Sequence, residues 1–411
     1  MKLSTAWNWQ LGIGILEDNV FGQPTLQTQP PDVDLLIEKR KEPRISLSLP
    51  IRYRKKGQGL SWFAAQSVDV SRNGVRLALD HEVKIGTQVD LAVKLPEVKD
   101  PVSLEGVVVW ANPSRNGSAV FECGIAFKNL RQLTNRDKIM YFMADKICSL
   151  AERNARNFHC RPALSREDLE RAYRLVYKEY QVKGYCEPDP SKMHYNLFSL
   201  LPTSRTFMLE KTGNFVGTIS LIPDTPCGLP LDSIFKGEID RFRLPGRKVA
   251  EVGLLALDGE SFEKSSFSLT DFQKLTGSFR LFKIMFDYAR NAAGITDLII
   301  GMHPKHRELY RYLLFQDIGP VRSYPGARGK PALLMHMNIE HVERSTVLHR
   351  GVGSYFLRNV MGLDELTSGY NWSSSDIQQY LVNRPSLLKK LTPENRQYLS
   401  LCYPELRLPE P

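Results

Sequence analysis

Two arginines with three residues between them, Arg40 and Arg44, precede the first strand-like segment of the sequence. Guanidinium groups bind phosphates and form paired hydrogen bonds with the O6 and N7 edge of a guanine, which lysine cannot match in geometry. The pair belongs to a run, residues 39–56, that holds eight basic residues and one acid. The pattern predicts a phosphate or nucleotide site, and a solvated basic linker is the alternative.

A polar turn containing Asp69, Ser71 and Gly74 follows between two apolar segments. Asp and Ser side chains form turns and still present a hydroxyl and hydrogen-bond acceptors to the edge of a base. A glycine leaves room where a bulky side chain would not fit. Taken alone, such a turn is more often a plain hairpin loop.

The elements that must position these residues are short strands. Alternating apolar residues recur from residue 45 to about residue 127, with Gly, Asn and Pro between the segments. Several short strands without an intervening helix are typical of a small β-barrel or sandwich. Apolar residues at helical spacing over 135–154 then predict a helix that leaves this unit.

The two arginines and the polar turn together, on short strands, resemble the PilZ domain family over about residues 36–130. The resemblance implies a six-stranded antiparallel barrel that binds the bacterial second messenger cyclic di-GMP. It also implies that Arg40 and Arg44 hold phosphate and guanine. Asp69, Ser71 and Gly74 would meet the base from the opposite side.

The second part of the chain alternates strands and helices. Ser165, three residues before Asp168, predicts a capped helix through Tyr180. Strands are predicted at 206–209, 216–221, 249–257, 298–300 and 332–337. Helices are predicted over 275–289 and 307–314, so the unit is α/β. Residues 341–411 are predicted to be largely helical and carry no recognisable motif.

Four segments of this unit, 216–224, 251–257, 302–315 and 324–334, resemble the N-acyl amino acid synthase family. The sharpest is the pattern His-Pro-x-His-x-x-x-Tyr-x-x-x-x-Phe that begins at His303. The family is related to the acyl-homoserine lactone synthases within the GNAT acyltransferase fold, and the resemblance covers about residues 165–340. It implies transfer of an acyl group from a thioester to an amine.

Such a reaction needs a group that takes a proton from the attacking amine and N–H groups that stabilise the oxyanion, which two splayed central strands can supply. Glu251 is the candidate base or substrate-orienting acid, with a structural glutamate as the alternative. His303 and His306 are each candidates for substrate contact, with structural histidines as the alternative. Tyr310 matches the position of a tyrosine near the leaving thiolate, or it is a packed helix aromatic. No residue pattern predicts a metal site.

The acyl donor is predicted from the absence of a recognisable acetyl-CoA pyrophosphate loop in the sequence. An acetyl-CoA pyrophosphate loop would need a glycine pattern that the segment 273–279 does not supply. A donor held by its pantetheine arm on acyl carrier protein needs no such loop. A basic patch would dock this acidic partner, and its candidate residues are Arg280, Lys283, Lys305, Arg307 and Arg311.

The composition is that of a globular protein, with 42% hydrophobic and 24% charged residues in 411 and a formal charge of +10. No stretch reaches the length of about 18 apolar residues that spans a membrane, and the N-terminus is a poor signal peptide, so a cytoplasmic protein is expected. The six cysteines contain no CxxC pattern. The basic residues form one short run rather than an aromatic-interleaved stripe, which argues against nucleic-acid binding.

The sequence therefore predicts a multidomain α+β protein with a small antiparallel β-barrel, a GNAT-like α/β acyltransferase domain and a helical C-terminal tail. The predicted parts are a leader (1–35), the barrel (36–134), a linker helix (135–163), the acyltransferase domain (164–340) and the tail (341–411). The predicted function is cyclic di-GMP-responsive transfer of a long-chain acyl group from acyl carrier protein to the α-amine of an amino acid. One alternative is a non-catalytic cyclic di-GMP signalling adaptor with a degenerate GNAT-like domain, and another is an acetyl-CoA-dependent acetyltransferase.

Overall fold

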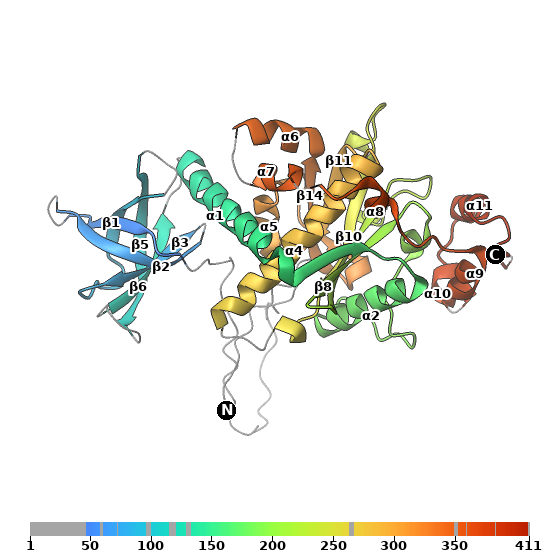
Figure 1. The fold of residues 1–411 in the computed structure, drawn as a ribbon, viewed down its shortest axis with the longest axis horizontal. Helices are drawn as coiled ribbons and strands as arrows, with labels where there is room; N and C mark the ends of the chain where they lie inside the picture. The colour runs from blue at the N-terminus through green and yellow to red at the C-terminus, as the bar shows by residue number, and fades with distance from the viewer. Residues whose placement is uncertain are drawn as a thin grey trace, which may run out of the picture. The chain divides into compact units, whose positions relative to one another are not determined.

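The structure, a computed structural model, describes residues 47–57, 61–71, 73–95, 100–114, 121–128, 133–262, 267–348, 352–358, 360–382 and 384–409 (Figure 1). The predicted leader, Arg40 and Arg44 lie outside these residues. The chain divides into two compact units, one comprising Arg40–Ser149 and the other containing Leu150–Pro411. Each unit is described by itself below.

The first unit is a closed antiparallel barrel of six strands in the order β1-β2-β3-β6-β5-β4. Its strands are β1 (Pro50–Lys55), β2 (Phe63–Ser71), β3 (Gly74–Leu79), β4 (Gln88–Val93), β5 (Val102–Pro113) and β6 (Phe121–Lys128). Alternate residues point inward, as in β5, where Val102, Leu104 and Val108 are buried. The barrel predicted from the short alternating segments is confirmed.

The second unit is built on a mixed sheet in the order β12-β14-β11-β10-β9-β8-β7. Its strands are β7 (Phe158–Pro162), β8 (Arg205–Lys211), β9 (Asn214–Pro223), β10 (Val249–Leu257), β11 (Asp297–Met302), β12 (Gln316–Asp317), β13 (Arg322–Tyr324, which pairs with β14) and β14 (Lys330–Asn338). The five predicted strands fall within β8, β9, β10, β11 and β14. The described strand pairs are antiparallel except for β10 with β11.

Two long helices lie on opposite faces of this sheet. The helix α2 (Arg166–Val182) packs with Met208 of β8, whereas α4 (Phe267–Asp287) approaches the next residue, Leu209, at Gly277. Neighbouring residues of a strand point to opposite faces, so the two helices cover different sides. The predicted cap of α2 is confirmed, because Ser165 accepts a hydrogen bond from the Asp168 N–H at 3.1 Å.

The remaining helices are shorter, apart from α1 (Leu133–Arg153), which belongs to the predicted linker interval. That interval ends in a strand that the sequence analysis did not predict, β7, which pairs with β8 at the edge of the sheet. The other helices are α3 (Asp232–Ile239), α5 (Arg307–Tyr312), α6 (Ile339–Leu348), α7 (Val352–Leu357), α8 (Leu363–Thr367), α9 (Ser374–Val382), α10 (Pro385–Leu388) and α11 (Pro393–Cys402). The C-terminal tail is therefore helical, as predicted.

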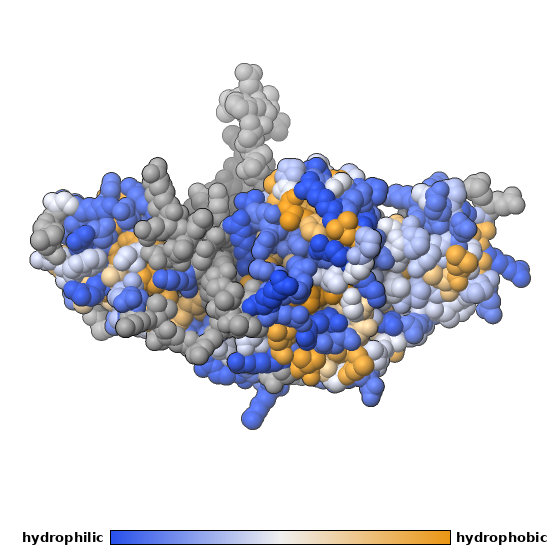
Figure 2. All heavy atoms as spheres, turned by 90° about the horizontal axis from the view of Figure 1, so that it is seen from above, coloured by the Kyte–Doolittle hydropathy of each residue, from blue (hydrophilic) through white to orange (hydrophobic). Residues whose placement is uncertain are grey.

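Hydrophilic residues cover most of the face seen in Figure 2, with apolar residues in small patches between them. The most exposed large apolar side chains are Val182 and Leu401, at 75% and 72%. In the described part of the chain, no helix is both long enough and apolar enough to span a membrane.

Candidate functional site

The central strands β10 and β11 separate halfway along their length. Their parallel pairing ends at Glu251 and Ile299, although β10 continues to Leu257 and β11 to Met302. Beyond this point the side chain of Leu231 packs closely against Gly301 of β11. The predicted splay of the central strands is thus present in the fold.

A bulge in β10 lies directly after the point of separation. Leu254 and Leu255 stand opposite a single residue of β9, Ile219, because the register shifts between Gly253 and Ala256. Leu254 has a positive φ of 48°, a conformation that costs a non-glycine residue about 1–2 kcal/mol. A bulge interrupts the regular ladder, so Leu254 and Leu255 do not each have a partner residue of their own in β9.

Glu251 is the last residue of the paired stretch and is 6% exposed. Its Oε2 accepts a hydrogen bond from the backbone N–H of Leu231 at 2.9 Å. Burial raises the pKa of the carboxyl to about 8, the Leu231 bond opposes this, and nearby Asp232 adds to it. The Glu251 side chain is therefore mainly protonated at pH 7 before substrate arrives.

The loop that carries Leu231 is held by one guanidinium. Arg243 bonds Asp224 with two nitrogens, at 2.7 and 3.0 Å, and Asp232 at 2.7 Å. The same oxygen of Asp232 accepts the N–H of Leu229 at 2.8 Å. The charge network thereby sets the position of the N–H group that contacts Glu251.

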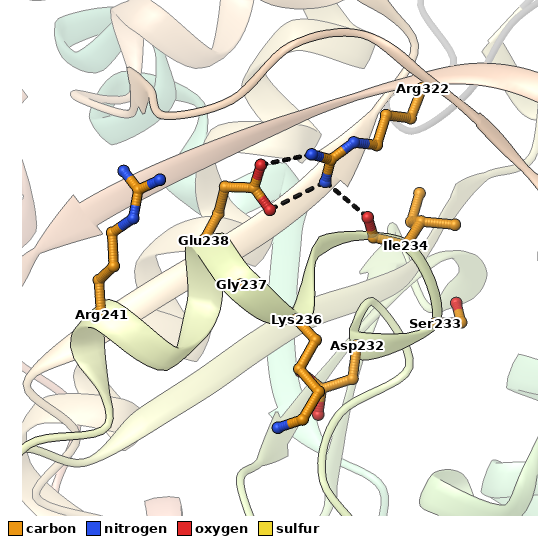
Figure 3. Close-up of a pocket in the computed structure, with 8 residues that line it drawn as sticks. All are labelled: Asp232, Ser233, Ile234, Lys236, Gly237, Glu238, Arg241 and Arg322. Atoms are coloured by element: carbon orange, nitrogen blue, oxygen red, sulfur yellow. Dashed lines mark hydrogen bonds and ion pairs between the residues drawn. The ribbon is translucent and has the colours of Figure 1, made fainter.

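A polar hollow of about 440 Å³ lies along α3, next to this loop (Figure 3). It is lined by Asp232, Ser233, Ile234, Lys236, Gly237, Glu238, Arg241 and Arg322. Arg322 crosses from β13 to bond both oxygens of Glu238, at 2.6 and 2.8 Å, and the Ile234 carbonyl at 2.6 Å. These bonds fasten α3 to β13, the strand that carries Tyr324.

Two phenols lie near the Glu251 carboxyl, the buried Tyr180 and the partly buried Tyr324. Burial raises the pKa of Tyr180 and of Tyr324, and the charge of Glu251 contributes to both shifts. Both phenols are therefore neutral at physiological pH. The Tyr180 ring also lies edge-on to Tyr185 at 5.7 Å and 5.1 Å from the ring of His194.

His303 begins the short turn after β11. Its Nδ1 accepts the Lys305 N–H at 3.2 Å, so the imidazole caps this turn. Burial lowers the pKa of His303 to about 4, helped by the charges of Lys305 and Lys330. Burial likewise lowers the pKa of His306 to about 3. Both imidazoles are neutral at pH 7.

Tyr310 is fully buried among aromatic rings of the α4 face. Its ring lies edge-on to Phe282 of α4 at 5.9 Å and to Phe315 at 6.0 Å. Glu251 instead interacts with Tyr180 of α2, on the other face of the sheet. The structure therefore places Glu251 and Tyr310 on the two sides of the central strands.

In the barrel, the β2–β3 hairpin brings the three predicted turn residues together. Ser71 pairs with Gly74 in register, and its hydroxyl donates to the Gly74 carbonyl at 3.2 Å. Asp69 lies opposite Arg76 and forms an ion pair with it at 2.7 Å. A Cβ at Gly74 would lie 2.5 Å from the Ile125 carbonyl oxygen, so only glycine fits there.

The predicted basic patch is partly neutralised. Lys283 is 13% exposed and bonds Asp287 at 2.6 Å. Arg307 and Arg311 both pair with Asp317, at 3.2 and 2.8 Å. Within the described ranges, no group of three or more His, Cys, Asp or Glu side chains is arranged to hold a metal ion.

Several residues of the site escaped the sequence analysis. Leu231 and Arg243 belong to no motif, and Tyr324, although it begins the segment 324–334, was not singled out as a site residue. Arg76 could have been predicted from the sequence, because a basic residue two positions after Gly74 lies opposite Asp69 in a tight hairpin.

The structure thus consists of a closed six-stranded β-barrel and an α/β unit on a mixed sheet. Residues 38–144 match the family model of the PilZ domain, and residues 171–338 match that of the N-acyl amino acid synthase FeeM. The chain thus carries a PilZ domain joined to an acyltransferase domain of the FeeM family.

Solved structures similar to this chain include that of FeeM, an N-acyl amino acid synthase from uncultured soil microbes. It is 28% identical over 44% of this chain and 92% of its own length, with a TM-score of 0.37. The AHL synthase LasI is 12% identical over 44% and 88%, with a TM-score of 0.34. The PilZ domain of YcgR from Escherichia coli, solved with c-di-GMP, is 15% identical over 24% and 86%, with a TM-score of 0.21. A search of curated proteins found no match.

Proposed function

We propose that this protein is a cyclic di-GMP-responsive N-acyltransferase. It moves a long-chain acyl group from acyl carrier protein to the α-amine of an amino acid. The observation that carries the proposal is the buried Glu251 carboxyl at the point where β10 and β11 separate, next to the bulge at Leu254. The match of this unit to the N-acyl amino acid synthase FeeM supports the choice of acceptor.

The chemistry requires one proton to move. The amine nitrogen attacks the thioester carbonyl carbon, the N–C bond forms, and the C–S bond breaks. Glu251 acts in its ionised form, the minor form at pH 7, and takes the proton that the nitrogen loses, which it then passes to solvent. The leaving sulfur takes its proton from the Tyr310 phenol on the other side of the strands, and solvent restores that phenol. The pKa of about 8 at Glu251 is close to the pKa near 8 of a free α-ammonium group, so near pH 8 the carboxylate and the neutral, nucleophilic amine are both present.

The oxyanion of the intermediate is assigned to the β10 bulge. Leu254 and Leu255 share one partner residue in β9, which frees an N–H group for the developing negative charge. We assign the leaving thiolate to the side of Tyr310, whose phenol is a proton donor. His303, neutral at pH 7 and placed at the end of β11, is assigned to substrate contact.

The acylation itself is tested by extracting lipids from cells that express the chain and analysing them by mass spectrometry. An N-acylated amino acid is expected with the parent protein and is expected to be absent with Glu251→Gln. The variant Glu405→Gln, an exposed glutamate of the same unit, is the matched control. If the parent protein yields no acylated amine, the chain is a signalling adaptor instead.

Acyl carrier protein is proposed as the donor, docking at Lys305, Arg307 and Arg311 around the start of α5. Reversing these three charges to Glu is expected to raise the donor KM and leave the acceptor KM unchanged. Arg344→Glu, at a 75%-exposed arginine of α6, is the control. Equal kinetics for the triple variant and the parent would refute this docking site.

Cyclic di-GMP is proposed as the ligand of the PilZ domain, held by Arg40, Arg44, Asp69, Ser71 and Gly74. Calorimetry should show binding to the parent chain and loss of binding in Arg40→Ala and Arg44→Ala. Arg52→Ala, at an exposed residue of β1, controls for the general effect of removing positive charge. Binding of equal strength to all four proteins would refute the assignment.

A further inference from the structure

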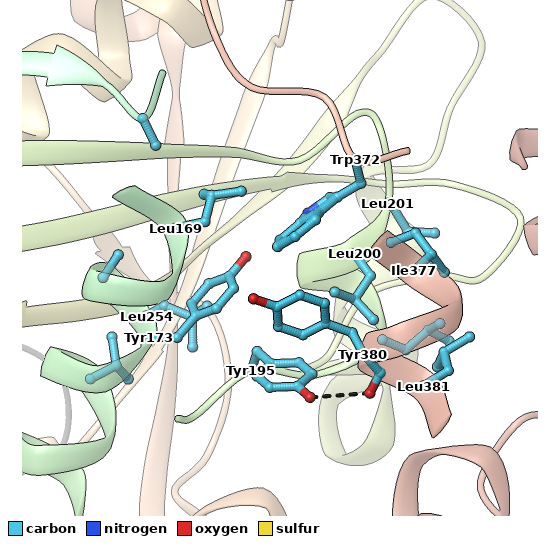
Figure 4. Close-up of a cluster of buried hydrophobic side chains, with 14 of the residues drawn as sticks. Leu169, Tyr173, Tyr195, Leu200, Leu201, Leu254, Trp372, Ile377, Tyr380 and Leu381 are labelled. Atoms are coloured by element: carbon cyan, nitrogen blue, oxygen red, sulfur yellow. Dashed lines mark hydrogen bonds between the residues drawn. The ribbon is translucent and has the colours of Figure 1, made fainter. Parts of the chain in front are cut away.

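The C-terminal segment, residues 360–409, packs onto α2 and onto the connection between α2 and β8, residues 183–204. We call these the C-terminal segment and the α2–β8 loop. Figure 4 shows Trp372, Ile377, Tyr380 and Leu381 of the segment among buried residues of α2 and the loop. The loop side of this cluster includes Tyr195, Leu200 and Leu201. The segment lies beyond the stretch that matches the FeeM family model, which ends at residue 338.

Backbone groups of the loop are held by side chains of the segment. The Tyr403 hydroxyl donates to the Leu200 carbonyl at 2.6 Å, and the Trp372 indole N–H donates to the Ser199 carbonyl at 3.3 Å. In return, the Tyr195 hydroxyl donates to the Tyr380 carbonyl at 3.2 Å. Each bond gives a loop backbone or side-chain group a fixed position.

Arg384 of the C-terminal segment bonds several groups of the α2–β8 loop at once. Its guanidinium bonds Asp189 at 2.8 and 3.2 Å, the Tyr195 carbonyl at 2.6 Å and the Met193 carbonyl at 2.9 Å. The same group lies 4.4 Å from the centre of the Tyr195 ring, and its side chain is 13% exposed. A planar, permanently charged guanidinium can join these groups at once, whereas an ammonium cannot.

The residue enclosed by these contacts faces the candidate site. His194 lies between Met193 and Tyr195, and its ring packs on Tyr180, the phenol that interacts with Glu251. Burial, with a smaller contribution from the charge of Arg384, lowers the pKa of His194 to about 4, so the imidazole stays neutral.

The α2–β8 loop also carries Tyr185, whose buried hydroxyl makes no hydrogen bond within the described residues. The hydroxyl of Tyr185 is fully buried, lies beside Tyr180, and has no hydrogen-bond partner among the residues that the structure describes. An unsatisfied buried hydroxyl is costly, and a polar atom of a bound substrate would satisfy it.

We propose that the C-terminal segment is a working part of the acyltransferase site and that Arg384 is a positioning residue for the amino-acid acceptor. Arg384 fixes the α2–β8 loop, which sets Tyr185 and His194 against Tyr180 on the acceptor side of Glu251. This inference rests on the proposed function. The donor is assigned to the other side of the central strands, so its binding does not depend on Arg384.

The kinetic test compares Arg384→Ala and Arg384→Lys with the parent protein. Both are expected to raise the acceptor KM about tenfold or more, because a small displacement of a binding group has effects of that order. The donor KM is expected to change less than twofold. Arg344→Ala is the control, since Arg344 is 75% exposed and lies in α6, outside the C-terminal segment.

A second measurement separates positioning from folding. Hydrogen exchange at residues 186–196 should be faster in Arg384→Ala, while exchange in β10 and β11 stays as in the parent. An unchanged acceptor KM together with faster loop exchange would refute the role in acceptor binding. Unchanged exchange at residues 186–196 would show that Arg384 does not fix the α2–β8 loop. This result can be obtained even if the parent protein shows no acyl transfer and the proposed function fails.

Discussion

Replacing Glu251 by glutamine should make the protein more stable at neutral pH while abolishing acyl transfer. In the folded chain the carboxyl stays protonated up to about pH 8, because burial raises its pKa from 4.5. In the unfolded chain it ionises above about pH 4.5. Between these values the folded state binds more protons, so the free energy of unfolding falls as pH rises.

The size of this effect follows from the two pKa values. Each tenfold change in proton concentration is worth about 1.4 kcal/mol for one group, so the parent loses on the order of 3 kcal/mol by pH 7. Above pH 8 the loss levels off at on the order of 5 kcal/mol. The glutamine amide does not ionise, and its oxygen can still accept the Leu231 N–H.

The assay is calorimetric unfolding of the parent, Glu251→Gln and the control Glu405→Gln from pH 5 to pH 8. The advantage of Glu251→Gln over the parent in the acyltransferase transition should grow steadily across this range. The control should follow the parent. If Glu251→Gln and the parent lose stability in parallel, Glu251 is not a buried, protonated carboxyl and the reasoning about the site is wrong.

Three further predictions concern other parts of the structure. Gly74→Ala should weaken cyclic di-GMP binding in calorimetry and destabilise the barrel by about 1–3 kcal/mol, because its Cβ would press on the Ile125 carbonyl; an unchanged melting temperature would contradict this. Arg243→Ala should lower kcat about tenfold, measured at saturating donor, because the loop bearing the N–H that contacts Glu251 loses its anchor. Asp297→Asn should lower the free energy of unfolding, measured with urea at pH 7, by about 3 kcal/mol. Burial disfavours the charge of Asp297, but hydrogen bonds from His336, Arg247 and other groups outweigh it and hold the pKa of the carboxyl well below its usual range. That stabilisation should disappear as pH falls toward the folded-state pKa, so the gap between parent and variant should close in acid.

The sequence alone was sufficient where the interacting residues are close along the chain. Asp69, Ser71 and Gly74 belong to one hairpin, and the Ser165 cap involves a residue three positions away, so a local pattern contains the whole interaction. The strands and helices of the second unit followed from apolar periodicity, which reports which side of an element is buried. Glu251 was predicted as a site residue because it is an acidic residue in an otherwise apolar central strand.

Only the tertiary structure decided what surrounds these residues. Leu231 and Arg243 contact the Glu251 site from a loop, and loops leave no periodic signal in a sequence. The basic patch around α5 lost part of its charge to Asp317, which a count of cations does not reveal. Arg384 meets Asp189 across 195 residues. Such contacts depend on how distant elements pack, so the sequence identified the chemistry, while packing decided which groups control it.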